Sequence, residues 1–122
     1  MNKWSKRSLD NLQTCDYRLQ LLFNTVLQVH DCSIICGYRG EEEQNKAFAE
    51  GKSKLKYPNG KHNKNPSIAV DVLPYPFKGW EDKEDFKKFS DIVKAVAYAL
   101  NIPIVWGGDW VSLVDMPHWE LK

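Results

Sequence analysis

Hydrophobic residues return at helical spacing in two stretches of this chain. In the first, about residues 15–29, leucine, phenylalanine and valine recur every three or four positions, which predicts an amphipathic helix. In the second, Asp82 is a suitable N-cap for a longer helix whose apolar stripe continues to Leu100. A third helix is expected to begin at Glu41, where acidic residues in the first turn favour the helix dipole, and to end at Gly51. The pattern therefore predicts about three helices.

Four short β-prone stretches are predicted as strands: residues 32–36, 68–73, 102–106 and 117–121. In the second of them Val70 and Val72 share one face, while Asp71 lies on the other and needs a partner if it is buried. Residues 52–67 contain prolines and a glycine among polar residues, so they are expected to form a long exposed loop. Helices and strands that mix without strict alternation favour an α+β fold, a single small domain with a short antiparallel sheet.

Composition narrows the class of protein. The chain has 122 residues, of which 43% are hydrophobic and 27% charged, as in an ordinary globular domain. Its formal net charge of +1 provides no overall field that would attract nucleic acid. No apolar stretch approaches the ~20 residues that span a bilayer, so membrane insertion is not expected. Lysines nevertheless gather between positions 52 and 64, either as a solvated loop or as a surface that approaches an anionic polymer.

Three cysteines, Cys15, Cys32 and Cys36, cannot all pair within the chain. No signal peptide is visible at the start of the sequence, so we interpret them as reduced thiols of a protein made in a cytoplasm. A metal cluster of His30 with Cys32 and Cys36 is disfavoured, because a strand that rises ~3.4 Å per residue separates the two thiols too far. Buried thiols that pack as small hydrophobes are the better interpretation.

Two of the three histidines lie in segments that look like the halves of one zinc site. The first segment runs from His62 to Asp71, and the second runs from Asp115 to His118. Two imidazoles and one carboxylate are suitable ligands for a catalytic zinc ion, whose fourth position stays open for water. Such an ion lowers the pKa of its water to ~7 and polarises a carbonyl oxygen. Taken singly, each histidine is equally compatible with packing or with a solvated position.

Two further residues offer the chemistry that such a site needs. Asp115 lies three residues before His118, and it is the candidate general base towards the water and general acid towards a leaving amine. Arg39 follows the predicted end of a strand. It is the candidate for stabilising charge on a carbonyl oxygen, or for holding a carboxylate of the substrate.

Together these motifs resemble the VanY-type zinc peptidases, which include D-alanyl-D-alanine carboxypeptidases and phage L-alanyl-D-glutamate endopeptidases. The family has a Gly-Tyr-Arg segment with a glutamine after it, a Ser-x-His-x-x-Gly-x-Ala-x-Asp block, and a final acid-x-x-His followed by an aromatic residue. The matching parts here are Gly37-Tyr38-Arg39 with Gln44, then His62 to Asp71, then Asp115 to Trp119. The segment Trp106 to Trp110 is similar to one that precedes this ending in the phage enzymes. The resemblance extends from about residue 8 to the C-terminus.

The resemblance implies a role for each matching residue. It makes Asp115 the catalytic acid and base, and it makes Arg39 the contact to the substrate's carbonyl or carboxylate. The chain departs from the pattern in two residue types, with Gly60 in place of serine and Ser67 in place of glycine. It also has two extra residues between His62 and Asp71. These departures change the loop but keep the types of the metal ligands. The other expected site residues are the zinc ligands His62, Asp71 and His118 and the substrate contacts Gln44, Ser53 and Trp119.

The fold implied is the zinc-peptidase fold of the hedgehog and DD-peptidase type, with residues 1–122 as one catalytic domain and no separate wall-binding domain. The expected function is that of a phage or prophage endolysin, a zinc-dependent peptidoglycan hydrolase that cleaves the L-alanyl-D-glutamate bond of stem peptides. Such a protein is expected to be a monomer, to accumulate in the host cytoplasm, and to need a separate holin-type protein to reach the wall. The alternatives are a D-alanyl-D-alanine carboxypeptidase and a catalytically inactive, zinc-stabilised binding module.

Overall fold

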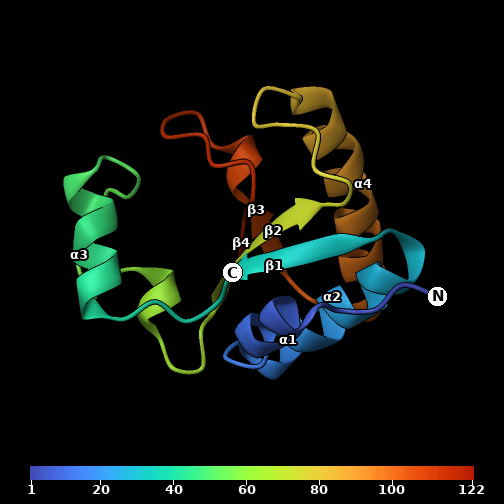
Figure 1. The fold of residues 1–122 in the computed structure, drawn as a ribbon, viewed down its shortest axis with the longest axis horizontal. Helices are drawn as coiled ribbons and strands as arrows, with labels where there is room; N and C mark the ends of the chain where they lie inside the picture. Colours follow the sequence, from blue (N-terminus) through green and yellow to red (C-terminus); the bar gives the residue numbers. More distant parts are fainter.

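A four-stranded antiparallel sheet lies at the centre of the computed structural model, which describes residues 1–122 (Figure 1). The order of the strands across the sheet is β1-β2-β4-β3, so the last strand of the chain is inserted between β2 and β3. All four predicted strands are present: β1 has the predicted bounds, and the ends of the other three differ from the prediction by at most two positions. Their bounds are β1 (Cys32–Cys36), β2 (Ala69–Pro74), β3 (Ile104–Trp106) and β4 (His118–Leu121).

Four α-helices accompany the sheet, one more than the hydrophobic pattern predicts. Helix α1 escaped prediction because it buries only Ser8 and Leu12, so no apolar periodicity marks it. The expected stop of α3 is confirmed, since the helix ends two residues before Gly51, whose φ of 76° favours glycine. None of the helices is long and apolar enough to cross a membrane. Their bounds are α1 (Lys6–Leu12), α2 (Tyr17–Val29), α3 (Glu41–Ala49) and α4 (Lys83–Leu100).

The hydrophobic core lies between one face of the sheet and the helices α1, α2 and α4, whereas α3 stands apart from them at the left of Figure 1. Helices α2 and α4 pack against each other with their predicted apolar stripes turned inwards. Val70 and Val72 of β2 belong to this core. Because successive side chains of a strand alternate between faces, Asp71 leaves β2 on the side away from the core. The core residues that α2 and α4 supply are Leu19, Leu22, Phe23, Val26, Leu27, Phe86, Phe89, Val93 and Ala97.

The segment predicted as a long exposed loop is exposed only in part. A 3₁₀ turn at Lys61–Asn63 buries both His62 and Asn63. The Asn63 amide donates to the Arg39 carbonyl oxygen at 2.8 Å, and its Oδ1 accepts from the Gly60 N–H at 2.8 Å. A Cβ at position 60 would lie 2.7 Å from that Oδ1, so the asparagine explains why glycine replaces the family's serine. The turn therefore fixes His62 in place, which corrects the expectation of a loop without structure.

Candidate metal centre and active site

The three predicted zinc ligands meet on the face of the sheet that is turned away from the core. Asp71 of β2 and His118 of β4 are partners in the antiparallel register, so their side chains leave the same face of the sheet. Asp71 Oδ1 lies 3.3 Å from His118 Nδ1. His62 reaches them from its turn, with Nε2 at 3.3 Å from Asp71 Oδ1 and 3.3 Å from His118 Nδ1.

These three atoms form an equilateral triangle whose dimensions suit one metal ion. Ligand atoms that surround a tetrahedral zinc ion at about 2.0–2.1 Å lie about 3.3–3.4 Å from one another. Asp71 Oδ1 is buried and accepts no hydrogen bond, which is costly for a carboxylate oxygen unless another group satisfies it. The residues present therefore fit the zinc ion that the sequence predicts.

The second ring nitrogen of each histidine has a fixed partner. His62 Nδ1 donates to the Gly37 carbonyl oxygen at 2.8 Å, and His118 Nε2 donates to Glu120 Oε1 at 2.8 Å. Glu120 in turn pairs with Lys61 at 3.1 Å. Such partners set the orientation of ligating imidazoles and raise their basicity. Glu120 was not among the predicted site residues, although strand alternation places it on the same face as His118.

The same alternation moves Trp119 away from the pocket, where a substrate contact was expected. Its side chain is 1% exposed and lies in the hydrophobic core. There it stacks on Trp106 and meets Phe23 edge to face. The aromatic residue on the pocket wall is Trp110 instead, with its ring centroid 5.0 Å from that of His118.

Asp115 lies beside the triangle, as its predicted role requires. Its Oδ2 is 3.9 Å from His118 Nδ1, and about a third of its side chain (34%) is exposed. The turn at Gly107 holds it there, because the Gly107 carbonyl oxygen accepts a hydrogen bond from the Asp115 N–H at 3.1 Å. A Cβ at position 107 would collide with the Asp115 carbonyl oxygen, so the turn needs glycine. Burial, followed by the negative charge of Asp71, raises the pKa of the Asp115 carboxyl group.

The half-buried Arg39 and the buried Gln44 are joined by a hydrogen bond next to the triangle. Arg39 Nη2 lies 3.5 Å from Asp71 Oδ2, the carboxylate oxygen outside the triangle, and Nη1 donates to Gln44 Oε1 at 3.2 Å. Gln44 is 1% exposed, and its amide nitrogen donates to Ser53 Oγ at 2.9 Å and to the Leu55 carbonyl oxygen at 2.6 Å. Gln44 and Ser53 both line the pocket. However, the polar atoms of Gln44 already bind protein groups, so it positions its neighbours.

Ion pairs within the triangle determine where protons reside in the metal-free protein. Burial alone would lower the pKa of His62, but the nearby negative charge of Asp71 outweighs it and raises the pKa to about 10. Burial likewise opposes ionisation of Asp71, yet His118 and His62 hold its pKa well below the usual range. A metal ion must displace the protons of these histidines, so its binding releases protons and weakens as the pH falls.

A thiol also lies close to the site, which the sequence did not indicate. Cys36 of β1 is the register partner of Asp71, and its Sγ lies 3.9 Å from His62 Nδ1. Cys36, His62 and Asp71 are therefore close enough to hold an ion, as are Asp71, Asp115 and His118. The orientation of His62 favours the two-histidine triangle, because Nδ1 is bonded to a backbone carbonyl while Nε2 faces Asp71 and His118.

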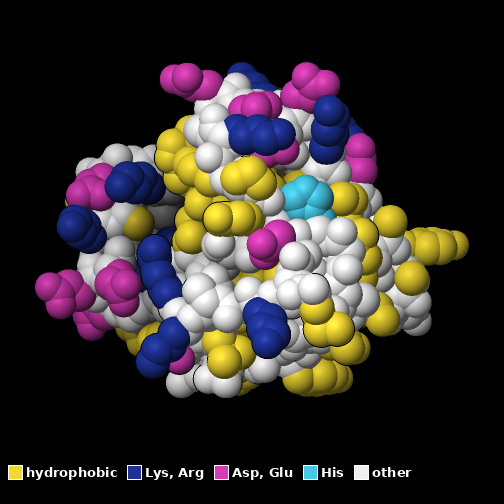
Figure 2. All heavy atoms as spheres, turned by 45° about the vertical axis from the view of Figure 1, so that its right-hand side comes forward, with side chains coloured by type: hydrophobic (Ala, Val, Ile, Leu, Met, Phe, Trp, Pro, Cys, Tyr) yellow, Lys and Arg dark blue, Asp and Glu magenta, His cyan; other side chains and the backbone are white.

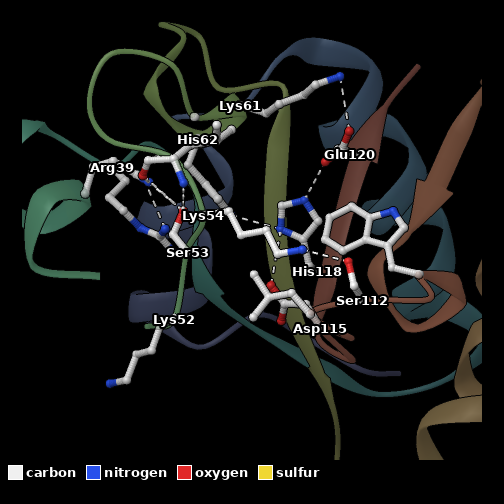
Figure 3. A pocket seen from close by; sticks show the side chains of 15 residues that line it. Arg39, Lys52, Ser53, Lys54, Lys61, His62, Ser112, Asp115, His118 and Glu120 are labelled. Carbon is white, nitrogen blue, oxygen red and sulfur yellow. Dashed lines mark hydrogen bonds and ion pairs between the residues drawn. The ribbon is translucent and has the colours of Figure 1, made fainter. Parts of the chain in front are cut away.

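The site opens into a pocket of about 420 Å³, shown in Figure 3. His62, His118 and Asp115 line it together with the loops on either side, which include residues 52–55 and 110–113. Structural zinc sites are closed by four protein ligands, whereas catalytic sites have three ligands and an open position. Three ligands at the edge of an open pocket are thus the arrangement typical of metallohydrolases.

A solved structure has this fold. The L-Ala D-Glu endopeptidase ChiX of Serratia marcescens matches with a TM-score of 0.83 and 26% identity, over 98% of this chain and 89% of that chain. The match confirms the predicted α+β fold class.

The sequence family agrees with the structural match. The family model for phage L-alanyl-D-glutamate peptidase matches residues 1–120, and the chain belongs to this family. The peptidoglycan L-alanyl-D-glutamate endopeptidase CwlK of Bacillus subtilis (strain 168) is 29% identical over 101 residues, or 75% of this chain. The chain spans 60% of the length of CwlK.

Proposed function

We propose that this protein is a zinc-dependent peptidoglycan hydrolase that cleaves the L-alanyl-D-glutamate bond of stem peptides. The observation that carries the proposal is the 3.3 Å triangle of His62, Asp71 and His118, with its unpaired buried oxygen, at the edge of an open pocket. The names of the family and of both relatives specify this same peptide bond as the one that is cleaved. Zinc bound there supplies a Lewis acid and lowers the pKa of a coordinated water to ~7.

In this proposal the protein's own residues position the reactants and move the proton. Asp115 takes the proton of the attacking water and passes it to the amine of the leaving glutamate. Its raised pKa suits both steps, because a base must also be able to give the proton back. Arg39 holds Asp71 in place and stabilises negative charge that develops on the scissile carbonyl oxygen. Glu120 keeps the His118 ring in the orientation that turns Nδ1 to the triangle.

The shape of the cleft favours an endopeptidase over a carboxypeptidase. A second hollow of about 650 Å³ lies against the first pocket, and Asp115 and Arg39 line both. A substrate can therefore extend on both sides of the reacting bond, whereas a carboxypeptidase needs a closed end that holds the terminal carboxylate. Asp115 and Arg39 also argue against an inactive binding module, which would need neither residue beside its metal ion.

We further propose that the enzyme serves as a phage endolysin. The family description, which names phage peptidases, supports this role. In this role the enzyme is made in the host cytoplasm, acts as a monomer, and depends on a separate holin-type protein for access to the wall.

Removal of the metal is expected to abolish lysis reversibly. A chelator should stop the loss of turbidity of outer-membrane-stripped Gram-negative cells, and stoichiometric zinc should restore it, because the proposed chemistry needs the Lewis acid. Turbidity over time, with the metal content of each sample, is the measurement. Full activity of the metal-free protein would contradict the proposed mechanism.

A further inference from the structure

The two hollows that meet at Asp115 differ in chemical character. The smaller pocket contains hydroxyl and lysine side chains, including Ser53, Lys54 and Ser112. The larger hollow, here called the apolar hollow, has more hydrophobic residues on its walls, including Ile35, Trp80, Val114, Met116 and Pro117; the charged residues Arg39, Lys52, Asp71 and Asp115 also line it. Figure 2 shows a hollow beside the lobe at its left, with basic side chains along one side and hydrophobic side chains along the other. The hydrophobic side chains of the cleft are therefore concentrated in the apolar hollow.

Lys54 is the cation of the smaller pocket whose charge is not compensated. Its Nζ donates to Ser112 Oγ at 2.6 Å, so the side chain extends across the pocket from one flanking loop to the other (Figure 3). A hydroxyl group is neutral and leaves the ammonium charge available to an anion. The other cations of the pocket each have a carboxylate partner: Lys52 has Glu50, Lys61 has Glu120 and Arg39 has Asp71.

The two sides of an L-alanyl-D-glutamate bond also differ, because only one of them carries a charge. When the alanine carbonyl is joined to the glutamate amine, both glutamate carboxyl groups remain on the leaving side of the bond. If one of them continues the peptide, the other stays free and carries a negative charge at neutral pH. The alanine residue contributes a methyl group and no charge.

We propose that the cleft binds the stem peptide in one direction, with the free glutamate carboxylate on Lys54 and the alanyl side in the apolar hollow. This inference rests on the proposed function and adds to it a residue that determines specificity. In this direction the carboxylate replaces Ser112 as the partner of the Lys54 ammonium group. A charge-assisted contact of this kind is worth more than the neutral one that it replaces.

A pair of substrates tests this assignment directly. The substrates are two muropeptides that are identical except that the free glutamate carboxyl group is either ionised or converted to the carboxamide. The zinc-loaded protein should cleave the ionised form with a kcat/KM about ten- to a hundredfold higher than the amide, as expected for a hydrogen bond to a charged group. In Lys54→Met, which keeps the length of the side chain without its charge, the ratio of the two values should approach one.

Two matched variants control for general effects of charge. Lys54→Arg keeps the cation and should keep most of the discrimination. Lys83→Met removes an exposed lysine that lines neither hollow, and its ratio should equal that of the unmodified protein. Because the ratio is taken within one preparation, a loss of folded protein cancels out.

The apolar hollow gives an independent readout of the direction. Trp80 is 56% exposed at this hollow, and Trp80→Ala should lower kcat/KM for substrates extended by glycan on the alanyl side, without changing the carboxylate-to-amide ratio. Tyr98→Ala, an exposed aromatic that lines neither hollow, is the control.

The possible outcomes separate this inference from the function on which it rests. Undiminished discrimination in Lys54→Met would overturn the assignment, as would equal cleavage of both substrates by the unmodified protein. A collapse of the ratio in Trp80→Ala would also overturn it. Failure of the zinc-loaded protein to cleave either muropeptide would instead refute the proposed function.

Discussion

Asp115→Asn should lower turnover severely while the protein keeps its fold and its zinc. The asparagine preserves the shape of the side chain and its hydrogen bonding to water, but it cannot accept the proton that Asp115 is proposed to transfer. General acid–base catalysis by one side chain typically contributes about 10²–10⁴-fold, so kcat/KM should fall by that factor. Asp115 Oδ2 lies outside the 3.3 Å triangle, at 3.9 Å from His118 Nδ1, so the metal should remain. Kinetics on a purified muropeptide and zinc content by mass spectrometry are measured on the same sample.

The variant His118→Ala shows whether Asp115 acts as a proton carrier or as a metal ligand. The alanine variant removes a ligand of the triangle, so it should lose both turnover and zinc. If Asp115→Asn loses as much zinc as His118→Ala, then Asp115 is itself a ligand. The set of Asp71, Asp115 and His118, which lie close enough to bind an ion, would then replace the triangle.

His118→Ala should lose zinc, whereas Cys36→Ser should retain it. The Cys36 thiol lies 3.9 Å from Nδ1 of His62, the ring nitrogen that is already bonded to a backbone carbonyl oxygen. His118 Nδ1 instead lies 3.3 Å from Nε2 of His62, the nitrogen that faces the triangle. Binding of an ion to the folded state alone stabilises it by ~2.7 kcal/mol at a concentration a hundred times Kd. Added zinc should therefore raise the melting temperature of the unmodified protein and of Cys36→Ser.

The melting temperature of His118→Ala should not respond to zinc at the same concentration. The opposite pattern, with a response in His118→Ala and none in Cys36→Ser, would assign the ion to Cys36, His62 and Asp71. X-ray absorption at the zinc edge provides a second test, because a thiolate ligand lies at about 2.3 Å and imidazole nitrogens lie at about 2.0–2.1 Å.

Much of the fold follows from local pattern, because α2 and α4, which supply most of the helical core residues, each carry an apolar stripe. Helices α2 and α4 and all four strands were predictable in this way. Helix α1 was not, because it contributes few buried side chains and is held instead by its caps, such as the Ser5 side chain that accepts from the Ser8 N–H. Capping by a single serine is too common a pattern to identify a seven-residue helix.

The residue types of the candidate site were predictable, but their arrangement was not. That Asp71 faces His118 depends on the register of β2 and β4, which are far apart in the sequence. Glu120 and Trp119 illustrate the limit of local reasoning. Side chains along β4 alternate between the two faces of the sheet. Because His118 lies on the face that carries the site, Glu120 must lie on that face too, and Trp119 must point into the core. The burial of His62 depends on contacts of Asn63 that no local pattern indicates.

The most direct test of the central claim is the mass of the products released from purified muropeptides by the zinc-loaded protein. Cleavage between the first two residues of the stem peptide is predicted, which leaves alanine on the glycan side and a peptide with a new N-terminal glutamate. Release of free D-alanine, with the bond between alanine and glutamate intact, would contradict the account and assign the protein to the carboxypeptidases.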